Sequence, residues 1–300
     1  MEIWNSVFSL ALVGTTLMFL TPILLAAIGG AITQQADILN IGLEGMMLVG
    51  AFSAIAVGAA AHSAVVGVLA AVVSALLLSI IYAICTLWWK ADFIVVGIGV
   101  NILALGLTVF LLQILYGNPG STPASVTISL PKPHLPVLGD QTALVYLALL
   151  CVPAYAFLLY RTRFGVHLRA VGEDLPAATA AGIDGTRVKF ISVMLCGVLC
   201  GLAGAQLSMA NLGSYTTNMT AGRGFIAVAA LTFGRARPVP TLAAAIIFGF
   251  ADAIADRLGV AGVNSNLAKM APYIITIVAL TLASLEIMKR RRRSAALKEA

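Results

Sequence analysis

Apolar residues in this chain gather into long runs separated by short polar segments. A helix that crosses a membrane needs about 20 consecutive, predominantly apolar residues. Eight runs reach or approach that length, at 7–29, 42–61, 64–88, 93–116, 142–160, 188–210, 239–257 and 270–288. A ninth run, 222–234, is shorter, and its length fits a half-helix, a re-entrant segment or a short tilted span. The pattern predicts an all-α fold, a polytopic transmembrane helix bundle.

The composition supports this interpretation, because 60% of the 300 residues are hydrophobic and only 10% are charged. A soluble domain is close to half apolar and about a quarter charged, so the bilayer must be the solvent for most of these side chains. The opening MEIWNSVF lacks the basic region and cleavage site of a signal peptide, so we expect 7–28 to remain as a first span. Small residues recur in the runs, as in GVLCGLAGA at 197–205, and let helices approach closely in lipid.

The basic residues are clustered, and such clusters indicate orientation in a membrane protein. The segment 161–189 carries five of the 18 basic residues, and five more form the run 289–293. Lys and Arg prefer cytoplasmic loops close to the ends of spans, so we expect both segments inside and no nucleic-acid partner. Nine crossings, N-terminus outside and C-terminus inside, satisfy both clusters. The predicted organisation is a transmembrane domain at 1–288, with a cytoplasmic loop at 161–189, and a basic cytoplasmic tail at 289–300.

Four polar residues lie in or beside the apolar runs: Asn40, Glu44, Asn101 and Arg223. Glu44, in NIGLEGMMLVG (40–50), has three possible interpretations. It can be hydrated at the membrane interface, it can cap the positive end of a helix dipole, or it can face a translocation path. For Asn101, bonding between helices competes with the same path. Arg223 can bind an anion or a partner loop, or extend its charged end to the interface. These four residues are the candidates for a translocation path.

Asp252, Asp256 and Arg257, in FADAIADRL, permit another interpretation. The two aspartates are four residues apart and share a helix face, as a proton relay would require, although an ion-paired helix end is simpler. The sequence contains no H-E-x-x-H zinc helix and no glycine-rich phosphate loop, so we expect no metal site and no ATP hydrolysis in the chain itself. The four cysteines lie in or beside apolar runs, where they behave as small hydrophobic residues.

The polar segment RAVGEDLPAATAAGIDGTRVK, 169–189, has the pattern of a brief helix. Asp174 can cap a helix with Pro176 in its first turn, and Gly182 can end it, with Ile183 exposed beyond. Gly172 loosens the chain ahead of this helix. A short helix with small residues and one apolar side chain suits docking into the cleft of another protein, and an ordinary solvated loop is the alternative.

Three stretches together resemble a known family. GEDLPAATAAGI, 172–183, is similar to the coupling-helix motif of permease subunits of bacterial ABC importers, in the group for ribose, simple sugars and branched-chain amino acids. NIGLEGMMLVGAFSA, 40–54, and GRGFIAVAALTFGRARP, 222–238, resemble a narrower branch, permeases paired with nucleoside-binding lipoproteins. Leu43, Glu44 and Gly45 stand where ribose-type members usually carry an Asp-Leu-Ser run, which favours the nucleoside branch.

The resemblance implies the membrane domain of a type II ABC importer, in a bacterial inner membrane. The implied partners are an ABC ATPase that binds the ATP, a second homologous permease subunit, an extracytoplasmic substrate-binding lipoprotein and membrane lipid. The residues implied to couple to the ATPase are Gly172, Glu173, Ala177, Ala178, Gly182 and Ile183. The chain would be a transport subunit rather than an enzyme, without a cofactor of its own, for a nucleoside or related simple sugar. A proton-coupled secondary transporter that uses Asp252 and Asp256 is the alternative.

Overall fold

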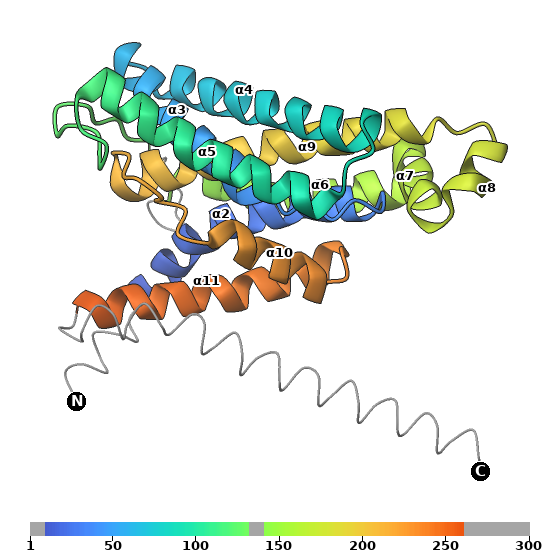
Figure 1. The fold of residues 1–300 in the computed structure, drawn as a ribbon. Helices are drawn as coiled ribbons and strands as arrows, with labels where there is room; N and C mark the ends of the chain where they lie inside the picture. The colour runs from blue at the N-terminus through green and yellow to red at the C-terminus, as the bar shows by residue number, and fades with distance from the viewer. Residues whose placement is uncertain (1–9, 132–140, 261–300) are drawn as a thin grey trace.

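The computed structural model describes residues 10–131 and 141–260 as a helical bundle (Figure 1). Its elements in chain order are α2 (Leu10–Gln34), α3 (Leu43–Ala60), α4 (Ala64–Ala83), η1 (Ile84–Trp88), α5 (Phe93–Tyr116), α6 (Ala143–Arg161), α7 (Arg163–Glu173), α8 (Leu175–Ala180), α9 (Gly185–Ala205), η2 (Gln206–Leu212), α10 (Arg223–Phe233) and α11 (Pro238–Val260). The π-helical segments η1 and η2 extend α4 and α9.

The apolar runs fold as helices of the predicted kind. Within the described residues, seven helices are long and apolar enough to cross a membrane, and α10 is a shorter apolar helix. These seven correspond to the first seven long runs, and α10 corresponds to the short run 222–234. The run 270–288 and the tail 289–300 lie outside the described residues. The chain is therefore an all-helical, multi-pass membrane protein, as the hydrophobic pattern predicts.

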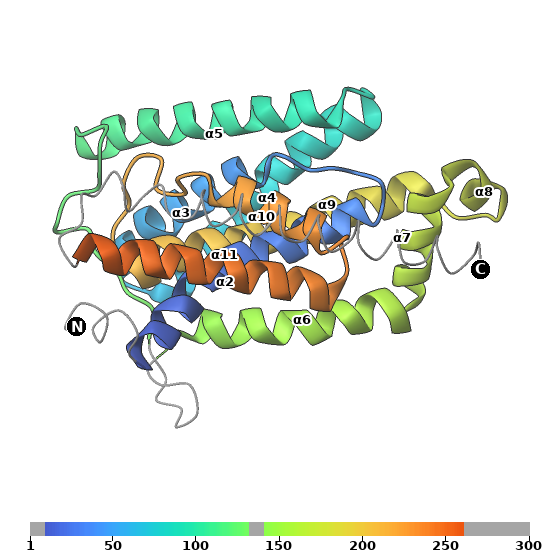
Figure 2. The same ribbon diagram turned by 90° about the horizontal axis from the view of Figure 1, so that it is seen from below.

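The bundle contains two similar halves that run in opposite directions. α2 and α9 pack against each other in the centre, and each is followed by a non-helical return segment, residues 35–42 and 213–222. α3 packs on α9 and α4, α10 packs on α2 and α11, and α4 packs on α9 as α11 packs on α2. In Figures 1 and 2, α3 and α10 extend from the middle of the bundle towards opposite ends. This is the arrangement of an inverted repeat, in which interrupted helices meet at mid-depth.

Glycines on α9 bring its backbone into close contact with α3 and α4. A Cβ atom on Gly201 would lie 2.7 Å from the carbonyl oxygen of Ala71, and one on Gly204 would lie 2.6 Å from the backbone nitrogen of Ala51. Real Cβ atoms do not approach other atoms so closely, so each position requires glycine. The small-residue stretch 197–205 therefore has the close-packing role that its composition predicts.

Large apolar side chains cover the outside of the bundle as well as its inside. Leu69 on α4 is 59% exposed and Ile102 on α5 is 68% exposed, while Leu24 and Met46 are fully buried. In water, exposed apolar surface of this extent carries a large free-energy cost. In a bilayer the same side chains face lipid, so the outer surface of α4 and α5 fits the membrane.

The two ends of the bundle differ in construction. α7 and α8 project at one end, which we call the α8 end (Figure 2). At the opposite end, the segment after α5 pairs with the return segment before α10 through a single antiparallel bridge between Ser121 and Thr216. The N–H of Thr122 donates to the carbonyl of Tyr215 at 3.0 Å. This bridge gives the Pro- and Gly-rich segment after α5 a short extended element.

Candidate functional site

Two asparagine side chains hold the N-terminus of α3. The Oδ1 atom of Asn40 accepts a hydrogen bond from the N–H of Gly42 at 2.9 Å. Asn101, from α5, accepts from the N–H of Gly45 at 2.7 Å and donates to the carbonyl of Ile41 at 3.0 Å. The first N–H groups of a helix have no partner within that helix, so these amides supply acceptors from outside. Asn101 therefore forms hydrogen bonds between α5 and the start of α3. Bonding between helices was one of its two predicted roles.

The glycines of the NIGLEG stretch let α5 approach this point. A Cβ atom on Gly45 would lie 2.9 Å from the Cα of Asn101. A Cβ atom on Gly97, across on α5, would lie 2.9 Å from the backbone nitrogen of Gly42. Without side chains at these positions, the amide of Asn101 reaches the α3 backbone directly.

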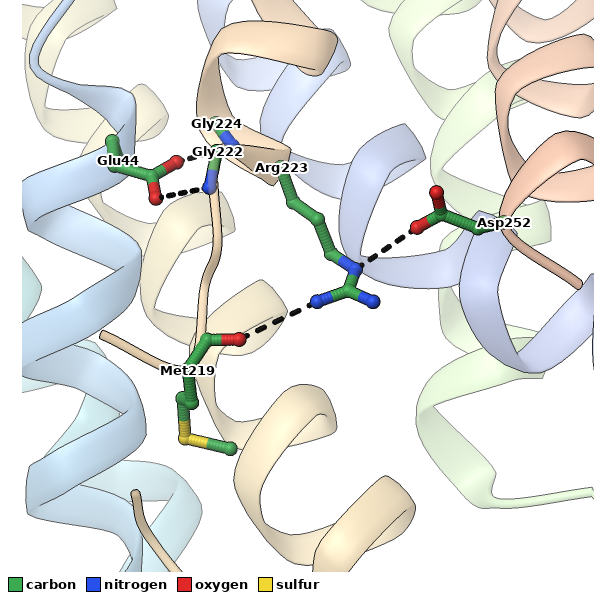
Figure 3. Close-up of polar contacts among 6 residues, drawn as sticks. All are labelled: Glu44, Met219, Gly222, Arg223, Gly224 and Asp252. Atoms are coloured by element: carbon green, nitrogen blue, oxygen red, sulfur yellow. Dashed lines mark hydrogen bonds and ion pairs between the residues drawn. The ribbon is translucent and has the colours of Figure 1, made fainter. Parts of the chain in front are cut away.

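Glu44, in the first turn of α3, binds the N-terminus of α10 (Figure 3). Its Oε1 atom accepts from the N–H of Gly222 at 2.8 Å, and its Oε2 atom accepts from the N–H of Gly224 at 2.6 Å. The positive end of a helix dipole and two charge-assisted hydrogen bonds stabilise a carboxylate there. A Cβ atom on Gly224 would lie 2.5 Å from the Cα of Glu44. The carboxylate therefore caps another helix, in a contact that glycine alone permits.

Arg223, the first residue of α10, joins α10 to three neighbouring groups. Its Nε atom lies 3.1 Å from the Oδ2 atom of Asp252 on α11, and a second guanidinium nitrogen donates to the carbonyl of Met219 at 3.4 Å (Figure 3). The guanidinium carbon also lies 5.5 Å from the centre of the Phe19 ring on α2. A buried charge is stable only when it is paired and hydrogen-bonded. Arg223 meets this condition between α10, α11 and α2.

The pairing of Asp252 differs from the sequence-based interpretation. Asp252 is buried and bonds Arg223, whereas Asp256, one turn later, is exposed. Arg257 donates to the hydroxyl of Thr15 on α2 at 3.2 Å. Asp252 therefore has a basic partner from another helix, α10. The two aspartates also differ in environment, although they are four residues apart.

All four path candidates gather at one junction, which we call the α3–α10 junction: Asn40, Glu44, Asn101 and Arg223. Asn40 is 1% exposed and Glu44 is 7% exposed. The amide nitrogen of Asn40 faces the sulfur of Cys196 at 3.5 Å. Their polar atoms face backbone groups and neighbouring side chains, so the junction fixes the N-termini of α3 and α10 relative to each other. A direct role on the translocation path stays a prediction for these residues.

The segment 161–189 folds into two short helices and the start of α9. The side chain of Asp174 accepts from the N–H of Ala177 at 3.0 Å and caps α8. At the other end, the N–H of Gly182 donates to Thr179 at 2.9 Å and the N–H of Ile183 donates to Ala178 at 3.0 Å. These two bonds form a Schellman motif, and Gly182 has the positive φ, 84°, that the motif requires. The predicted start and end of the short helix are confirmed.

Two residues of this segment have surroundings that differ from the prediction. Gly172 does not loosen the chain, because it lies inside α7, where a Cβ atom would overlap the carbonyl oxygen of Gln35. Ile183 is half-buried against the bundle instead of fully exposed, because the Schellman turn directs it back towards α8 and α9. Ala178 is buried, while Glu173, Ala177 and Gly182 are exposed. The outer face of α8 and the turns that flank it are therefore exposed.

No three His, Cys, Asp or Glu side chains come together as a possible metal site within residues 10–131 and 141–260. The four cysteines are free thiols, two buried and two half-buried. Cys196 and Cys200 belong to the buried core and Cys151 packs against it, as expected for cysteines in membrane helices.

Gln35 and Tyr155, which the structure brings together, were not selected as site residues from the sequence. Gln35 follows α2, and its Nε2 atom donates to the carbonyl of Ala236, just after α10, at 2.9 Å. The hydroxyl of Tyr155 on α6 donates to the same oxygen at 2.7 Å. The pair Gln34–Gln35 near the end of an apolar run was an available signal, but the partner of Gln35 is 201 residues away in sequence.

The fold defines a multi-pass membrane protein, and its family follows from sequence comparison. The chain belongs to the family described as branched-chain amino acid transport system / permease component, which matches residues 12–280. It is 35% identical over 297 residues to the guanosine ABC transporter permease protein NupQ of Bacillus subtilis, with 90% of this chain and 91% of the relative covered.

Two further relatives agree with this assignment. The chain is 34% identical over 290 residues to the nucleoside ABC transporter permease protein NupC of Lactococcus lactis, covering 90% of this chain and 91% of the relative. It is 35% identical over 259 residues to the putative glucose ABC transporter permease protein TsgC13 of Haloferax volcanii, covering 83% of this chain and 78% of the relative. The chain is thus an ABC transporter permease subunit, and the predictions of a permease family and of a non-enzymatic transport subunit are confirmed.

Proposed function

We propose that the chain forms part of the translocation path of an ATP-driven importer for nucleosides. The observation that carries this proposal is the similarity over nine-tenths of the chain to permeases named for guanosine and for nucleosides. The TsgC13 relative, named for glucose, makes a simple sugar the alternative substrate. The Leu-Glu-Gly sequence at 43–45 supports the nucleoside alternative, because it is typical of that branch.

The proposed topology has nine crossings in a bacterial inner membrane, with the N-terminus outside and the C-terminus inside. Seven span-length helices and α10 account for eight of these, and the run 270–288 would be the ninth. The basic residues of 161–189 support a cytoplasmic location for the α8 end. The bridged segments around Ser121 and Thr216 then face outwards, where a substrate-binding lipoprotein would dock.

The exposed face of α8 is the proposed contact with an ABC ATPase, which would bind and hydrolyse the ATP. Its small side chains and the cap and Schellman motif give a rigid, compact projection that suits a cleft. The residues proposed to carry this coupling are Gly172, Glu173, Ala177, Ala178, Gly182 and Ile183. A second, homologous permease subunit would form the opposite wall of the path.

The α3–α10 junction suits a role in positioning α3 and α10 beside that path. α3 and α10 start at a common point and diverge, so a small tilt of α10 would move its far end relative to α2 and α11. A carrier path must release what it admits, so we expect low affinity for the free substrate. Asn40, Glu44, Asn101 and Arg223 would keep the helix ends in register while the halves move.

The proposal is tested by uptake in proteoliposomes that contain the chain, the ATPase and the partner permease. Radiolabelled guanosine, delivered by the binding protein, should accumulate with ATP inside and with the proton gradient collapsed by an ionophore. Glucose should not compete at equal concentration. Accumulation that requires the proton gradient and no ATPase would contradict the importer, and preferential transport of glucose would contradict only the substrate.

A further inference from the structure

One backbone carbonyl at the end of α10 receives hydrogen bonds from two other elements. The carbonyl of Ala236 accepts from Gln35 Nε2 at 2.9 Å and from the hydroxyl of Tyr155 at 2.7 Å. Ala236 is 3% exposed and Tyr155 is 2% exposed. Arg235 and Ala236 both have φ of 51°, a conformation that residues with a Cβ atom seldom adopt without support. The turn after α10 is therefore held in place by side chains of the α2 end and α6.

Gln35 also contacts the segment that carries α8. Its carbonyl oxygen lies where a Cβ atom of Gly172 would be, so the backbones of Gln35 and α7 are in direct contact. α7 leads into α8 through the capping residue Asp174, and it packs on α6 and α9. A displacement of α8 that moves α7 therefore acts on Gln35 without an intervening side chain.

The space beside this contact leaves room for movement. An open depression of about 500 Å³ lies between α7 and the end of α10. Arg169 and Glu173 line it from α7, and Thr232 and Arg235 line it from the end of α10. These four residues are exposed. Gln35 lies at the edge of the depression and bridges its two sides, by its backbone to α7 and by its side chain to Ala236.

The chain segment that starts at Gln35 also reaches the other end of α10. Residues 35–42 lead to Asn40 and to α3, whose first turn carries Glu44. Glu44 binds the N-terminus of α10, and Gln35 binds the turn at its C-terminus. Gln35, after α2, and Glu44, at the start of α3, therefore hold the two ends of α10, and the backbone of Gln35 is in direct contact with α7.

We propose that Gln35 is a positioning residue that transmits displacement of the ATPase-docking segment to α10. The proposal rests on the proposed function, because it takes the outer face of α8 as the ATPase contact. The hydrogen bond from Gln35 to Ala236 makes the end of α10 follow α7, while Tyr155 ties the same carbonyl to α6. Without the Gln35 amide, a displacement of α7 no longer moves the end of α10, and the docking surface on α8 is unchanged.

The test compares Gln35→Met, which keeps length and removes the donor, with the wild-type chain in the reconstituted complex. The ATPase should co-purify and hydrolyse ATP at the basal rate. The maximal rate with guanosine-loaded binding protein should fall about fivefold, the factor expected for loss of one ordinary hydrogen bond. The binding-protein concentration for half-maximal stimulation should stay the same, because the outer face is unaltered. Tyr155→Phe removes the second donor and should lower the same maximal rate.

Gln34→Met is the matched control, since Gln34 lines the same depression and its Oε1 atom has no hydrogen-bond partner in the described part of the chain. It should behave as wild type. Equal stimulation of wild type and Gln35→Met would overturn the inference, as would an equal loss in Gln34→Met or a Gln35→Met complex that no longer holds the ATPase. Absence of stimulation in the wild-type complex would instead contradict the proposed function.

Discussion

At the scale of single residues, Glu44 and Arg223 show how charges are accommodated inside this bundle. Glu44 is stabilised by two backbone N–H groups at a helix N-terminus, without a basic side chain. Arg223 has an acidic partner, a carbonyl and an aromatic ring. Ionisable groups within a membrane are costly unless they are paired in this way. Substitutions at either residue should therefore act first through the position of α10.

Glu44→Gln is expected to destabilise the protein. The amide oxygen can still accept one N–H, but the amide nitrogen is a donor and cannot accept the second. Loss of a hydrogen bond to a charged group costs about 1.5–3 kcal/mol. Thermal unfolding of the purified protein in detergent should show a lower Tm than wild type. Glu173→Gln, at an exposed position, is the control and should leave the Tm unchanged. An unchanged Tm for Glu44→Gln would show that the cap is dispensable.

Asp252→Asn distinguishes between two roles for Asp252, a structural ion pair with Arg223 and a proton-binding site. The substitution leaves Arg223 without its carboxylate and should lower stability by about 1–3 kcal/mol, whereas Asp256→Asn, at an exposed position, should have little effect. We then compare ATP-driven guanosine uptake with and without a proton gradient, normalised to the amount of folded protein. The effect of the gradient on uptake should be the same for Asp252→Asn as for wild type. Uptake that depends on the gradient in wild type and is abolished in both variants would support the proton-coupled alternative.

At the scale of helices, local signals were sufficient for some elements and insufficient for others. The capping aspartate, the early proline and the final glycine of α8 act within a few residues, so Asp174 and Gly182 could be assigned from sequence. The acceptors at the α3–α10 junction come from distant segments, and a polar residue in an apolar run does not indicate its partner. For the same reason the sequence did not indicate that Asp252 pairs with Arg223, which lies on another helix.

Gly182→Val tests the end of α8. The φ of 84° disfavours a β-branched residue, whereas asparagine tolerates it, so Gly182→Asn is the matched control. No atom lies within 4 Å of the position a Cβ would take, so the effect arises from backbone conformation and not from a clash. Gly182→Val should reach the membrane in normal amount and bind less ATPase in a pull-down. Gly182→Asn should bind as wild type. Equal binding by both variants would mean that the turn does not shape the docking surface.

At the scale of the whole molecule, hydrophobic runs predict how many helices cross but not how they pack. In lipid, an apolar face is compatible with many neighbours, and close contacts are selected by small residues whose partners lie far along the chain. The contact of Gly204 on α9 with Ala51 on α3 is an example. The inverted arrangement of the two halves could not be inferred from the sequence for this reason, although both return segments follow a predicted span.

The proposed orientation can be tested by labelling two exposed positions at opposite ends of the bundle. Ser125 follows α5, and Thr179 lies on α8; both are exposed. Each is changed to cysteine in a background without Cys85, Cys151, Cys196 and Cys200. Because basic loops stay in the cytoplasm, an impermeant maleimide applied to intact cells should label Ser125→Cys and not Thr179→Cys. Permeabilised cells should label both, which controls for reactivity. Labelling of Thr179→Cys alone in intact cells would reverse the orientation and place α8 where no ATPase could reach it.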